Sequence, residues 1–347
     1  MNALQQAWYQ RSALSTLLRP LSWGFRLMSR LRRLAYQAGI KRVHHVGVPV
    51  IVVGNITTGG TGKTPLVIWL AQILKEAGYL PGIVARGYRG KARHWPQQVR
   101  PDSDPVMVGD EAVVLAARCQ CPVAVAPHRV SAVKALLAHH DCNVVISDDG
   151  LQHYALGRDI EIAVVDGIRR FGNGYCLPAG PLREPLQRLD KVDYIVVTEG
   201  SAMQREYLMR LKADEMVNVR HREQTCRPDQ LASGRVHAVA GIGNPQRFFI
   251  LLRRMGFDII EHPFPDHHEF TLHDLEFTDS LPVVMTEKDA VKCRRFAGDN
   301  WWFLAVTAML DEKLRTGLLE KLYQNTQHEL PLTGMSLESN RESTHYG

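Results

Sequence analysis

Residues 48–65 read Val-Pro-Val-Ile-Val-Val-Gly-Asn-Ile-Thr-Thr-Gly-Gly-Thr-Gly-Lys-Thr-Pro, and this stretch decides the fold. Its first six residues form a continuous apolar, β-branched run, which is typical of a buried parallel strand. A helix is expected from Pro65 to about Ala77, because proline in a first turn loses no hydrogen bond. Strand, glycine-rich loop, Lys-Thr and helix follow one another as in a P-loop, which predicts a nucleotide-binding α/β domain.

Each residue type in this loop has a physical use. Glycines let backbone N–H groups approach phosphate oxygens closely, and the helix N-terminus adds partial positive charge. Lys63 can reach the β- and γ-phosphates, and the hydroxyl of Thr64 can bind Mg²⁺. The strict motif has glycine where this chain has Thr57, so the other glycines must supply the flexibility. The residues predicted to bind the nucleotide are Gly59, Gly60, Thr61, Gly62, Lys63, Thr64 and Pro65.

The acidic part of a nucleotide site should follow another buried strand. The mostly apolar run 143–147 leads into Asp148 and Asp149, and either aspartate can hold Mg²⁺ directly or through water. The other interpretation is a plain Asp-Asp-Gly turn. ATP is expected rather than GTP, because the chain lacks the guanine-reading Asn-Lys-x-Asp, and residues 286–289, Thr-Glu-Lys-Asp, have the wrong spacing. ATP and Mg²⁺ are therefore the predicted cofactors.

The charge of the 347-residue chain is unevenly distributed. Eight of its 42 Lys and Arg lie within residues 1–45, which hold no Asp or Glu, and this leaves 34 basic against 36 acidic residues elsewhere. The net charge of +6 thus belongs to the N-terminus, which argues against a nucleic-acid-binding surface and for a local anionic partner. Neither a long apolar run nor a signal-peptide pattern is present, so we expect a cytoplasmic chain with no membrane-spanning helix.

A helix from Pro20 to about Ala38 is expected to be amphipathic. Arg26, Arg30 and Arg33 fall on one face, and roughly opposite lie Leu21, Phe25, Met28, Leu31 and Ala35. Basic and apolar faces without acids fit a helix on an anionic membrane surface. A helix packed on the protein body, with solvated arginines outside, is the other interpretation, and both can hold together.

Three further polar clusters follow apolar segments or open a helix. Residues 85–90 read Ala-Arg-Gly-Tyr-Arg-Gly, residues 109–112 read Gly-Asp-Glu-Ala, and residues 180–185 read Gly-Pro-Leu-Arg-Glu-Pro. In open α/β sheets, ligands gather at the carboxyl ends of the strands, so we expect these loops to converge.

The ordered set of motifs resembles the tetraacyldisaccharide 4′-kinase family, the lipid A 4′-kinases of Gram-negative bacteria. In chain order the motifs are Gly-Asn-x-x-x-Gly-Gly-x-Gly-Lys-Thr-Pro, Ala-Arg-Gly-Tyr-x-Gly, Gly-Asp-Glu, Asp-Asp-Gly-x-Gln-His, Gly-x-x-Arg-Glu and Phe-Pro-Asp-His-His. The likeness runs from about residue 15 to residue 325, and Thr57 belongs to the family's pattern.

The resemblance implies MgATP-dependent phosphorylation of the 4′-hydroxyl of a tetraacylated glucosamine disaccharide 1-phosphate, at the cytoplasmic face of the bacterial inner membrane. It implies that Asp110 is the general base and that His267 pairs with it; Lys63, assigned above from the chemistry of the P-loop, is the third residue predicted to be catalytic. The substrate contacts assigned from it are Arg86, Tyr88, Glu111, Gln152, His153 and Arg183, and the metal contacts are Thr64, Asp148, Asp149 and Glu184. We expect a monomer whose partners are the lipid substrate and the anionic membrane surface, with no nucleic acid.

The chemistry of phosphoryl transfer agrees with these assignments. A sugar hydroxyl is a poor nucleophile, so a carboxylate should accept its proton, and arginines such as Arg86 can neutralise phosphate charge. Taken without the resemblance, each residue also has a plainer interpretation. Asp110 can simply cap a helix, His267 can be a solvated loop residue, and Arg183 with Glu184 can be a surface ion pair.

The expected fold is a P-loop NTPase-type, mostly parallel sheet with helices on both faces, followed by a smaller C-terminal α/β domain. The predicted units are an N-terminal amphipathic helix (1–40), a P-loop kinase domain (41–232), the C-terminal domain (233–326) and a polar tail (327–347). Because Asp110 and His267 fall in different domains, we expect their pairing to form or tighten when the domains close.

Two other hypotheses remain open on the residues alone. A membrane-recruited ATPase switch of the partitioning type has a similar loop, but its usual extra lysine near the loop start is absent here. A soluble small-molecule kinase would leave the acid-free N-terminus without a purpose.

Overall fold

The computed structural model describes residues 7–10, 12–231 and 234–328, and the described residues form one 13-stranded sheet. Its order is β11-β10-β12-β13-β8-β7-β6-β1-β5-β2-β4-β3, with β9 paired to β8. The strands are β1 (Val50–Gly54), β2 (Pro81–Ala85), β3 (Gln97–Val99), β4 (Val123–Val125), β5 (Val144–Asp148), β6 (Ile160–Asp166), β7 (Tyr194–Thr198), β8 (Glu206–Asn218), β9 (Thr225–Cys226), β10 (Arg235–Ala240), β11 (Asp258–Pro263), β12 (Val283–Thr286) and β13 (Trp301–Met309).

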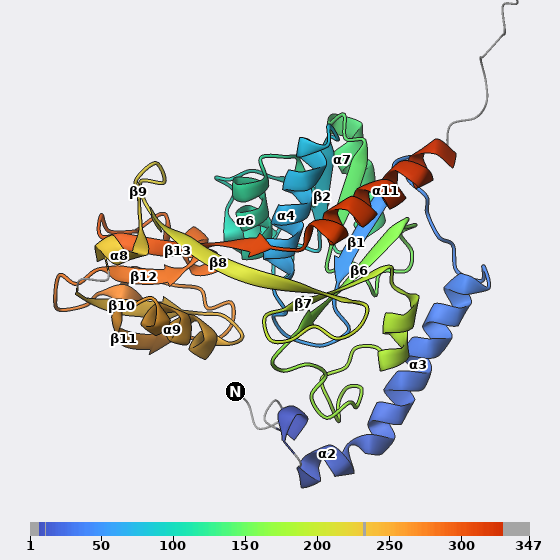
Figure 1. Ribbon diagram of the computed structural model, residues 1–347, viewed down its shortest axis with the longest axis horizontal. Coiled ribbons are helices and arrows are strands. Elements are labelled where there is room, and N and C mark those ends of the chain that lie inside the picture. The colour runs from blue at the N-terminus through green and yellow to red at the C-terminus, as the bar shows by residue number, and fades with distance from the viewer. Residues whose placement is uncertain (1–6, 11, 232–233, 329–347) are drawn as a thin grey trace, which may run out of the picture.

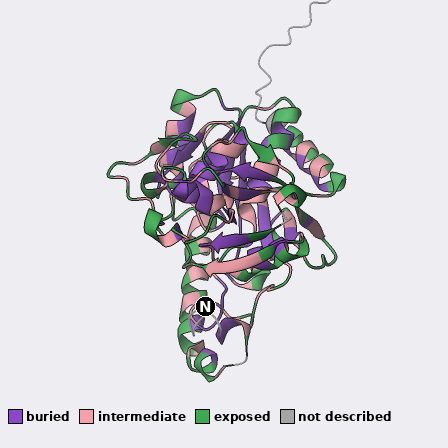
Figure 2. Cartoon of the chain, turned by 90° about the vertical axis from the view of Figure 1, so that its left-hand side faces the viewer, coloured by how far each residue is buried: buried purple, intermediate pink, exposed green. Residues whose placement is uncertain are grey.

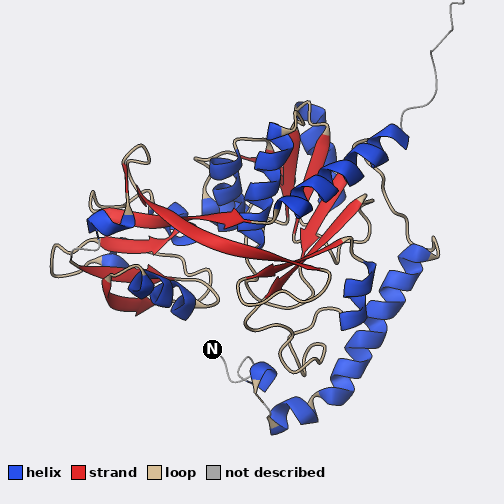
Figure 3. Cartoon of the chain, viewed as in Figure 1, coloured by secondary structure: helices blue, strands red, loops and turns tan. Residues whose placement is uncertain are grey.

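Helices surround this sheet in both halves of the molecule (Figure 3). They are α2 (Ala13–Leu17), α3 (Arg19–Gln37), α4 (Lys63–Glu76), α5 (Pro105–Val108), α6 (Asp110–Cys119), α7 (Arg129–His139), α8 (Pro228–Leu231), α9 (Pro245–Arg254), α10 (Glu287–Cys293) and α11 (Glu312–His328), with single 3-10 turns η1 (Leu186–Lys191) and η2 (Leu272–Leu275). The predicted P-loop strand and helix are present as β1 and α4.

The first lobe is built around β1, which lies between β5 and β6 and is parallel to both. Every residue of β1 is buried, because both faces of the strand are covered. Ile51 and Val53 pack on the face that carries α4 and α6, and Val50 and Val52 pack on the face that carries α7. The prediction of a mostly parallel sheet with helices on both faces is thus confirmed.

Two long strands join the lobes (Figure 1). The first residues of β8 pair with β7 in the parallel sense, and the rest of β8 pairs antiparallel with β13. The second lobe continues through β12, β10 and β11, which are parallel to one another and to β13. The sheet therefore runs without interruption from one lobe into the other, and β8 belongs to both.

The C-terminal helix returns to the first lobe. Leu314, Leu318 and Leu322 of α11 are buried, and they pack in the same core as the apolar residues of α4. The sequence had placed this helix in the second domain, within 233–326; its leucines instead cover the first lobe. The expected boundary at residues 232–233 and most of the expected tail, residues 329–347, lie outside the described residues.

The N-terminal helices contact the body through a narrow face. The hydroxyl of Ser22 donates to the carbonyl oxygen of Cys176 at 2.7 Å, and Phe25 packs against the first-lobe core, although we had placed it on the free apolar face. Leu21, Met28 and Leu31 are 63%, 65% and 56% exposed. Figure 2 shows this segment as largely exposed, in contrast to the buried strands. No helix in the described part of the chain is long and apolar enough to cross a membrane.

Candidate active site

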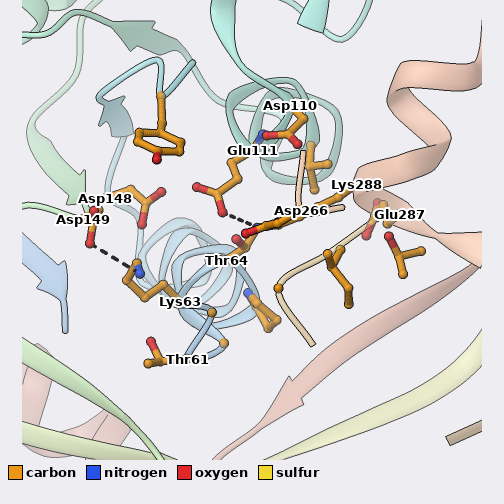
Figure 4. A pocket seen from close by; sticks show the side chains of 18 of the residues that line it. Thr61, Lys63, Thr64, Asp110, Glu111, Asp148, Asp149, Asp266, Glu287 and Lys288 are labelled. Carbon is orange, nitrogen blue, oxygen red and sulfur yellow. Dashed lines mark hydrogen bonds and ion pairs between the residues drawn. The ribbon is translucent and has the colours of Figure 1, made fainter. Parts of the chain in front are cut away.

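A cavity of ≈ 400 Å³ opens where the two lobes meet. The P-loop, the end of β5 and the start of α6 line it from the first lobe, and the loop after β11 and the start of α10 line it from the second. Figure 4 shows acidic and basic side chains from all these elements directed into one space. The expected convergence of loops is therefore present in this cavity.

The P-loop conformation explains both its glycines and its departure from the strict motif. Gly62 has φ 85°, and a Cβ there would lie 2.9 Å from the side chain of Thr198, so both backbone and space demand glycine. Thr57 is not among the residues with positive φ; it is buried and forms a β-bridge with Leu182. Since residue 57 makes an ordinary strand-like contact with the 180–185 loop, threonine fits where other P-loops have glycine.

The two aspartates after β5 have unequal partners. Asp149 lies 3.4 Å from the ammonium of Lys63 and 3.1 Å from the guanidinium of Arg183. Burial would raise the pKa of Asp149, but these two cations lower it. Asp148 is buried, and its Oδ1 has no hydrogen-bond partner among the described residues. Burial and the nearby charge of Glu111 raise the pKa of Asp148 to about 7.

The pair of Asp110 and His267 is formed across the lobes. His267 Nδ1 lies 2.9 Å from Asp110 Oδ2, while Asp110 Oδ1 accepts the N–H of Glu111 at 2.8 Å. The N-cap of α6 is Gly109, without a side-chain hydrogen bond, so Asp110 begins the helix rather than caps it. Burial would raise the pKa of Asp110, but the hydrogen bond from His267 and the charge of Lys288 lower it to about 2. The same hydrogen bond raises the pKa of His267.

Backbone geometry holds both members of this pair. Gly109 has φ 92°, and a Cβ there would lie 3.0 Å from the carbonyl oxygen of Tyr88, so α6 can begin directly against the 85–90 loop. His267 has φ 60°, an unusual conformation for a residue other than glycine. Its ring packs 5.4 Å from the ring of Tyr88, and Arg89 donates to the carbonyl oxygen of Asp266 at 3.0 Å. The loop after β11 is thus fixed on the first lobe.

Most of the predicted site residues line the cavity. Those lining it are Gly59, Gly60, Thr61, Gly62, Lys63, Thr64, Pro65, Arg86, Tyr88, Asp110, Glu111, Asp148, Asp149, Arg183 and His267. Their convergence is a property of the fold; the role of each residue remains a prediction.

Three predicted contacts lie behind the cavity wall instead. Gln152 donates to the backbone oxygen of Asn55 at 3.0 Å and to Glu184 at 2.8 Å. Glu184 is buried and also accepts the hydroxyl of Tyr154, so its oxygens are used within the protein. His153 Nε2 accepts the N–H of Arg129 at 3.1 Å. None of the three is among the residues that line the cavity, and the assignment of Glu184 to metal and of the other two to substrate remains a prediction.

Several cavity residues were missed in the sequence, and Arg129 and Lys288 are two of them. Arg129 is fully buried and donates to the carbonyl oxygens of Ala126 and Asp148 at 3.2 and 2.9 Å, which fixes the backbone beneath the acidic pair. Lys288 reaches Glu111 from the second lobe. Nothing in the apolar helix around Arg129 marks it; Lys288 could have been found as a lysine shortly after the apolar run 281–285.

Comparisons with known proteins agree with this geometry. The sequence model of LpxK, tetraacyldisaccharide-1-P 4′-kinase, matches residues 14–323. A tetraacyldisaccharide 4′-kinase of Nitrosococcus oceani is 54% identical over 93% of this chain and 95% of its own length, and one of Methylobacillus flagellatus is 48% identical over 94% and 98%. The crystal structure of LpxK from Aquifex aeolicus in complex with ATP has a TM-score of 0.76 at 27% identity, covering 89% of this chain and 100% of that chain. The chain belongs to the tetraacyldisaccharide 4′-kinase (LpxK) family.

Proposed function

We propose that this cavity transfers the γ-phosphate of ATP to the 4′-hydroxyl of a tetraacylated disaccharide 1-phosphate, a precursor of lipid A. The observation that carries the proposal is the Asp110–His267 pair, which lines the same cavity as Lys63 of the P-loop. One part of the cavity suits a triphosphate and the other suits a hydroxyl that must lose its proton. The family membership of the chain supplies the identity of the two substrates.

The nucleotide binds along the P-loop in this proposal. Backbone N–H groups of residues 59–63 and the N-terminus of α4 surround the phosphates, where the helix dipole favours negative charge. Lys63 now pairs with Asp149 at 3.4 Å and lies 3.4 Å from Asn55 Oδ1. When a triphosphate enters, the ammonium of Lys63 can exchange these partners for the β- and γ-phosphate oxygens.

The residues beside the P-loop fit a magnesium ion. The partnerless oxygen and raised pKa of Asp148 show a carboxylate whose negative charge the protein does not balance. Asp148, Asp149 and Thr64 would hold the ion, and phosphate oxygens and water would complete its shell, as is usual for Mg²⁺. When bound, the ion supplies neutralisation of charge on the transferring phosphoryl group.

The acceptor hydroxyl meets Asp110. The dyad with Asp110 ionised and His267 neutral can take up one proton, and the hydrogen bond between the two residues stabilises the protonated pair. Because the two groups are strongly coupled, the proton belongs to the pair rather than to either residue. Arg86, Tyr88 and Arg183 line the adjoining wall and are the proposed contacts for the polar groups of the acceptor and the transferring phosphate.

Labelled ATP tests this proposal directly. The native chain, Mg²⁺, γ-³²P-ATP and detergent-dispersed tetraacyl disaccharide 1-phosphate should give a labelled lipid, resolved by thin-layer chromatography. Lys63→Met should reduce the label at least about 10²-fold, because a charged phosphate contact is lost. Lys134→Met, on the exposed side of α7, is the matched control and should keep the native rate.

One outcome would favour the rival hypothesis. If the label appears as free phosphate at the same rate with and without the lipid, the protein is an ATPase and the phosphoryl-acceptor proposal fails. If the labelled product is the lipid, the partitioning-type switch is excluded.

We further propose that α3 binds the anionic cytoplasmic face of the bacterial inner membrane and that the protein acts there as a monomer. Leu21, Met28 and Leu31 are exposed on the same helix that carries the acid-free basic sequence. Such a helix binds in the interface through apolar burial and attraction to anionic lipid. This arrangement would keep a membrane-held acceptor close to the cavity.

Vesicle sedimentation tests the membrane surface. Replacing Leu21, Met28 and Leu31 by Ser should weaken binding to vesicles containing anionic lipid at least about tenfold, because three exposed apolar side chains that would enter the membrane are lost. Replacing Leu80, Ile250 and Leu272, which are exposed elsewhere, is the matched control and should leave binding unchanged. Equal binding of all three proteins would exclude α3 as the contact. Light scattering in detergent checks the expected monomer.

A further inference from the structure

Two consecutive acids at the start of α6 each pair with a base from the other lobe. Asp110 pairs with His267, and the next residue, Glu111, pairs with Lys288. Figure 4 shows the Glu111–Lys288 contact next to Asp110 and Asp266. The family motifs that led us to the first pair do not include Lys288, and nothing in the phosphoryl-transfer proposal uses it.

The surroundings of Lys288 keep its charge in place. Burial alone would lower the pKa of this lysine, but the charges of Glu111, Asp110 and Asp266 raise it. The side chains of Lys288 and Glu111 are 29% and 31% exposed, so the pair is partly screened but still faces the cavity. Lys288 is therefore a fixed positive charge that the second lobe brings to an acidic wall of the first.

The contact is part of a wider fit between two helices. The residue before Lys288, Glu287, is paired in the opposite sense: its carboxylate accepts from Arg118 of α6 at 2.9 Å. Thus Glu111 in the first turn of α6 pairs with Lys288 of α10, and Arg118 in the last turn of α6 pairs with Glu287 of α10. Since α10 packs against α6, this exchange fixes one register between the lobes.

Glu111 needs such a partner because of where it lies. Its charge acts on Asp148 across the cavity and on Asp110 beside it. Without Lys288, three carboxylates would share this corner with only the more distant charge of Lys63 acting on Glu111, and Glu111 would gain by turning away. The backbone N–H of Glu111 donates to Asp110 Oδ1, so a shift of the first turn of α6 at Glu111 would disturb the aspartate that faces the acceptor.

We propose that Lys288 is a positioning residue for phosphoryl transfer: it holds Glu111 when the lobes are together and thereby keeps Asp110 aligned with the acceptor hydroxyl. This inference rests on the proposed function. Lys288 does not contact the reacting atoms; its ion pair is with Glu111, and its charge also acts on Asp110. Closure of the lobes then brings His267 to Asp110 and Lys288 to Glu111 in the same movement.

Kinetics of Lys288→Met, Glu111→Gln and the double variant test the inference, with Lys288→Arg as the variant that keeps the charge. Lys288→Met should lower kcat about 10–100-fold, the effect of losing a charged hydrogen bond, while KM for ATP stays within about threefold. Lys288→Arg should recover most of kcat, and the double variant should be no slower than Lys288→Met, because both changes break the same contact.

A second lobe-crossing lysine gives the matched control. Lys91 pairs with Glu269 at 2.6 Å, but both side chains are mostly exposed, at 59% and 63%. Lys91→Met should change kcat by less than about twofold, because exposed ion pairs contribute little. If lysines between the lobes only held the lobes together, Lys288→Met and Lys91→Met would have similar kcat values.

Several results would overturn the inference and leave the proposed function intact. Native kcat in Lys288→Met, a raised KM for ATP with kcat unchanged, or a double variant whose deficit is the product of the two single deficits would each do so. If Lys288→Met does not fold, Glu111→Gln probes the same contact from the first lobe, and its native kcat would be equally decisive. An inactive native protein, in contrast, would contradict the proposed function itself.

Discussion

Two pairs of neighbouring acids line one cavity, yet the two pairs have different partners. Asp110 and Glu111, at the start of α6, each meet a base from the second lobe, His267 or Lys288. Of the two aspartates after β5, Asp149 pairs with cations of its own lobe, while Asp148 keeps an oxygen without a described partner.

The difference shows how the surroundings of an acid separate two roles. The α6 pair is balanced by protein charges that arrive only with the other lobe, so its state depends on how the lobes meet. In the β5 pair, burial opposes the ionisation of Asp148 and its Oδ1 has no partner among the described residues, so a divalent cation would favour its charged form. We therefore propose that one pair moves a proton and that the other holds a metal ion.

The largest effect is expected at Asp110. Asp110→Asn removes the proton acceptor but keeps the size and the hydrogen-bond geometry of the side chain, so kcat should fall about 10²–10⁴-fold. Transfer of ³²P to the lipid disaccharide measures this loss, and ATP binding should remain near native. A variant within about threefold of the native rate would show that the α6 pair carries no base, since general-base catalysis contributes far more.

Asp104→Asn is the matched control for this substitution. Asp104 caps α5 by accepting the N–H of Val106, forms a further ion pair with the largely exposed Arg295, and does not line the cavity. Asparagine caps a helix about as well as aspartate, so its activity should stay within about twofold of native.

The partner of the base should have a smaller, pH-dependent effect. His267→Asn removes a hydrogen bond to a charged group, so kcat at pH 8 should fall about 10–100-fold. The hydrogen bond to Asp110 raises the pKa of His267 above its usual 6.5. At a pH below this raised pKa, the native pair already carries the proton that it should accept, so the native protein loses activity as the pH falls through the pKa of His267.

Asparagine does not titrate, so the deficit of the variant should shrink between pH 8 and pH 5.5. The ratio of variant to native kcat isolates this effect, because acid effects on the β5 pair are common to both proteins. A ratio that stays constant over this range would show that His267 does not titrate with the base.

The sequence was sufficient for the nucleotide half because its signals are local. The apolar run, the glycines and Lys63 with Thr64 occupy consecutive positions, and each fixes the geometry of the next. Asp148 and Asp149 were found for the same reason, as acids directly after a buried strand. Asp110 and His267 had plain alternative interpretations as isolated residues, and only the ordered family motifs led us to pair them.

What the sequence did not indicate depends on long-range packing. The strand β8 mixes charged and apolar residues and carries no turn signal at the point where it passes from one lobe to the other. Its pairing with β7 and β13 is decided by the neighbours that each half meets. Glu184 illustrates the same limit, because its burial beside Tyr154 and Gln152 arises from a loop that the linear motif cannot orient.

The smallest effect concerns the stability of the β5 pair. The folded protein raises the pKa of Asp148 from 3.8 to about 7, so ionising this group costs stability as the pH rises through that window. In EDTA at pH 8, Asp148→Asn should therefore increase the free energy of unfolding by about 1–2 kcal/mol, although it abolishes a metal contact. Urea denaturation measures the difference, which should shrink towards pH 4, where the native group is also neutral.

Magnesium with ATP should reverse the order of stability at pH 8, because the native protein alone gains the full ion contact. A variant that is less stable than the native protein at pH 8 in EDTA would mean that Asp148 is balanced by the protein after all, and the contrast between the two acidic pairs would no longer hold.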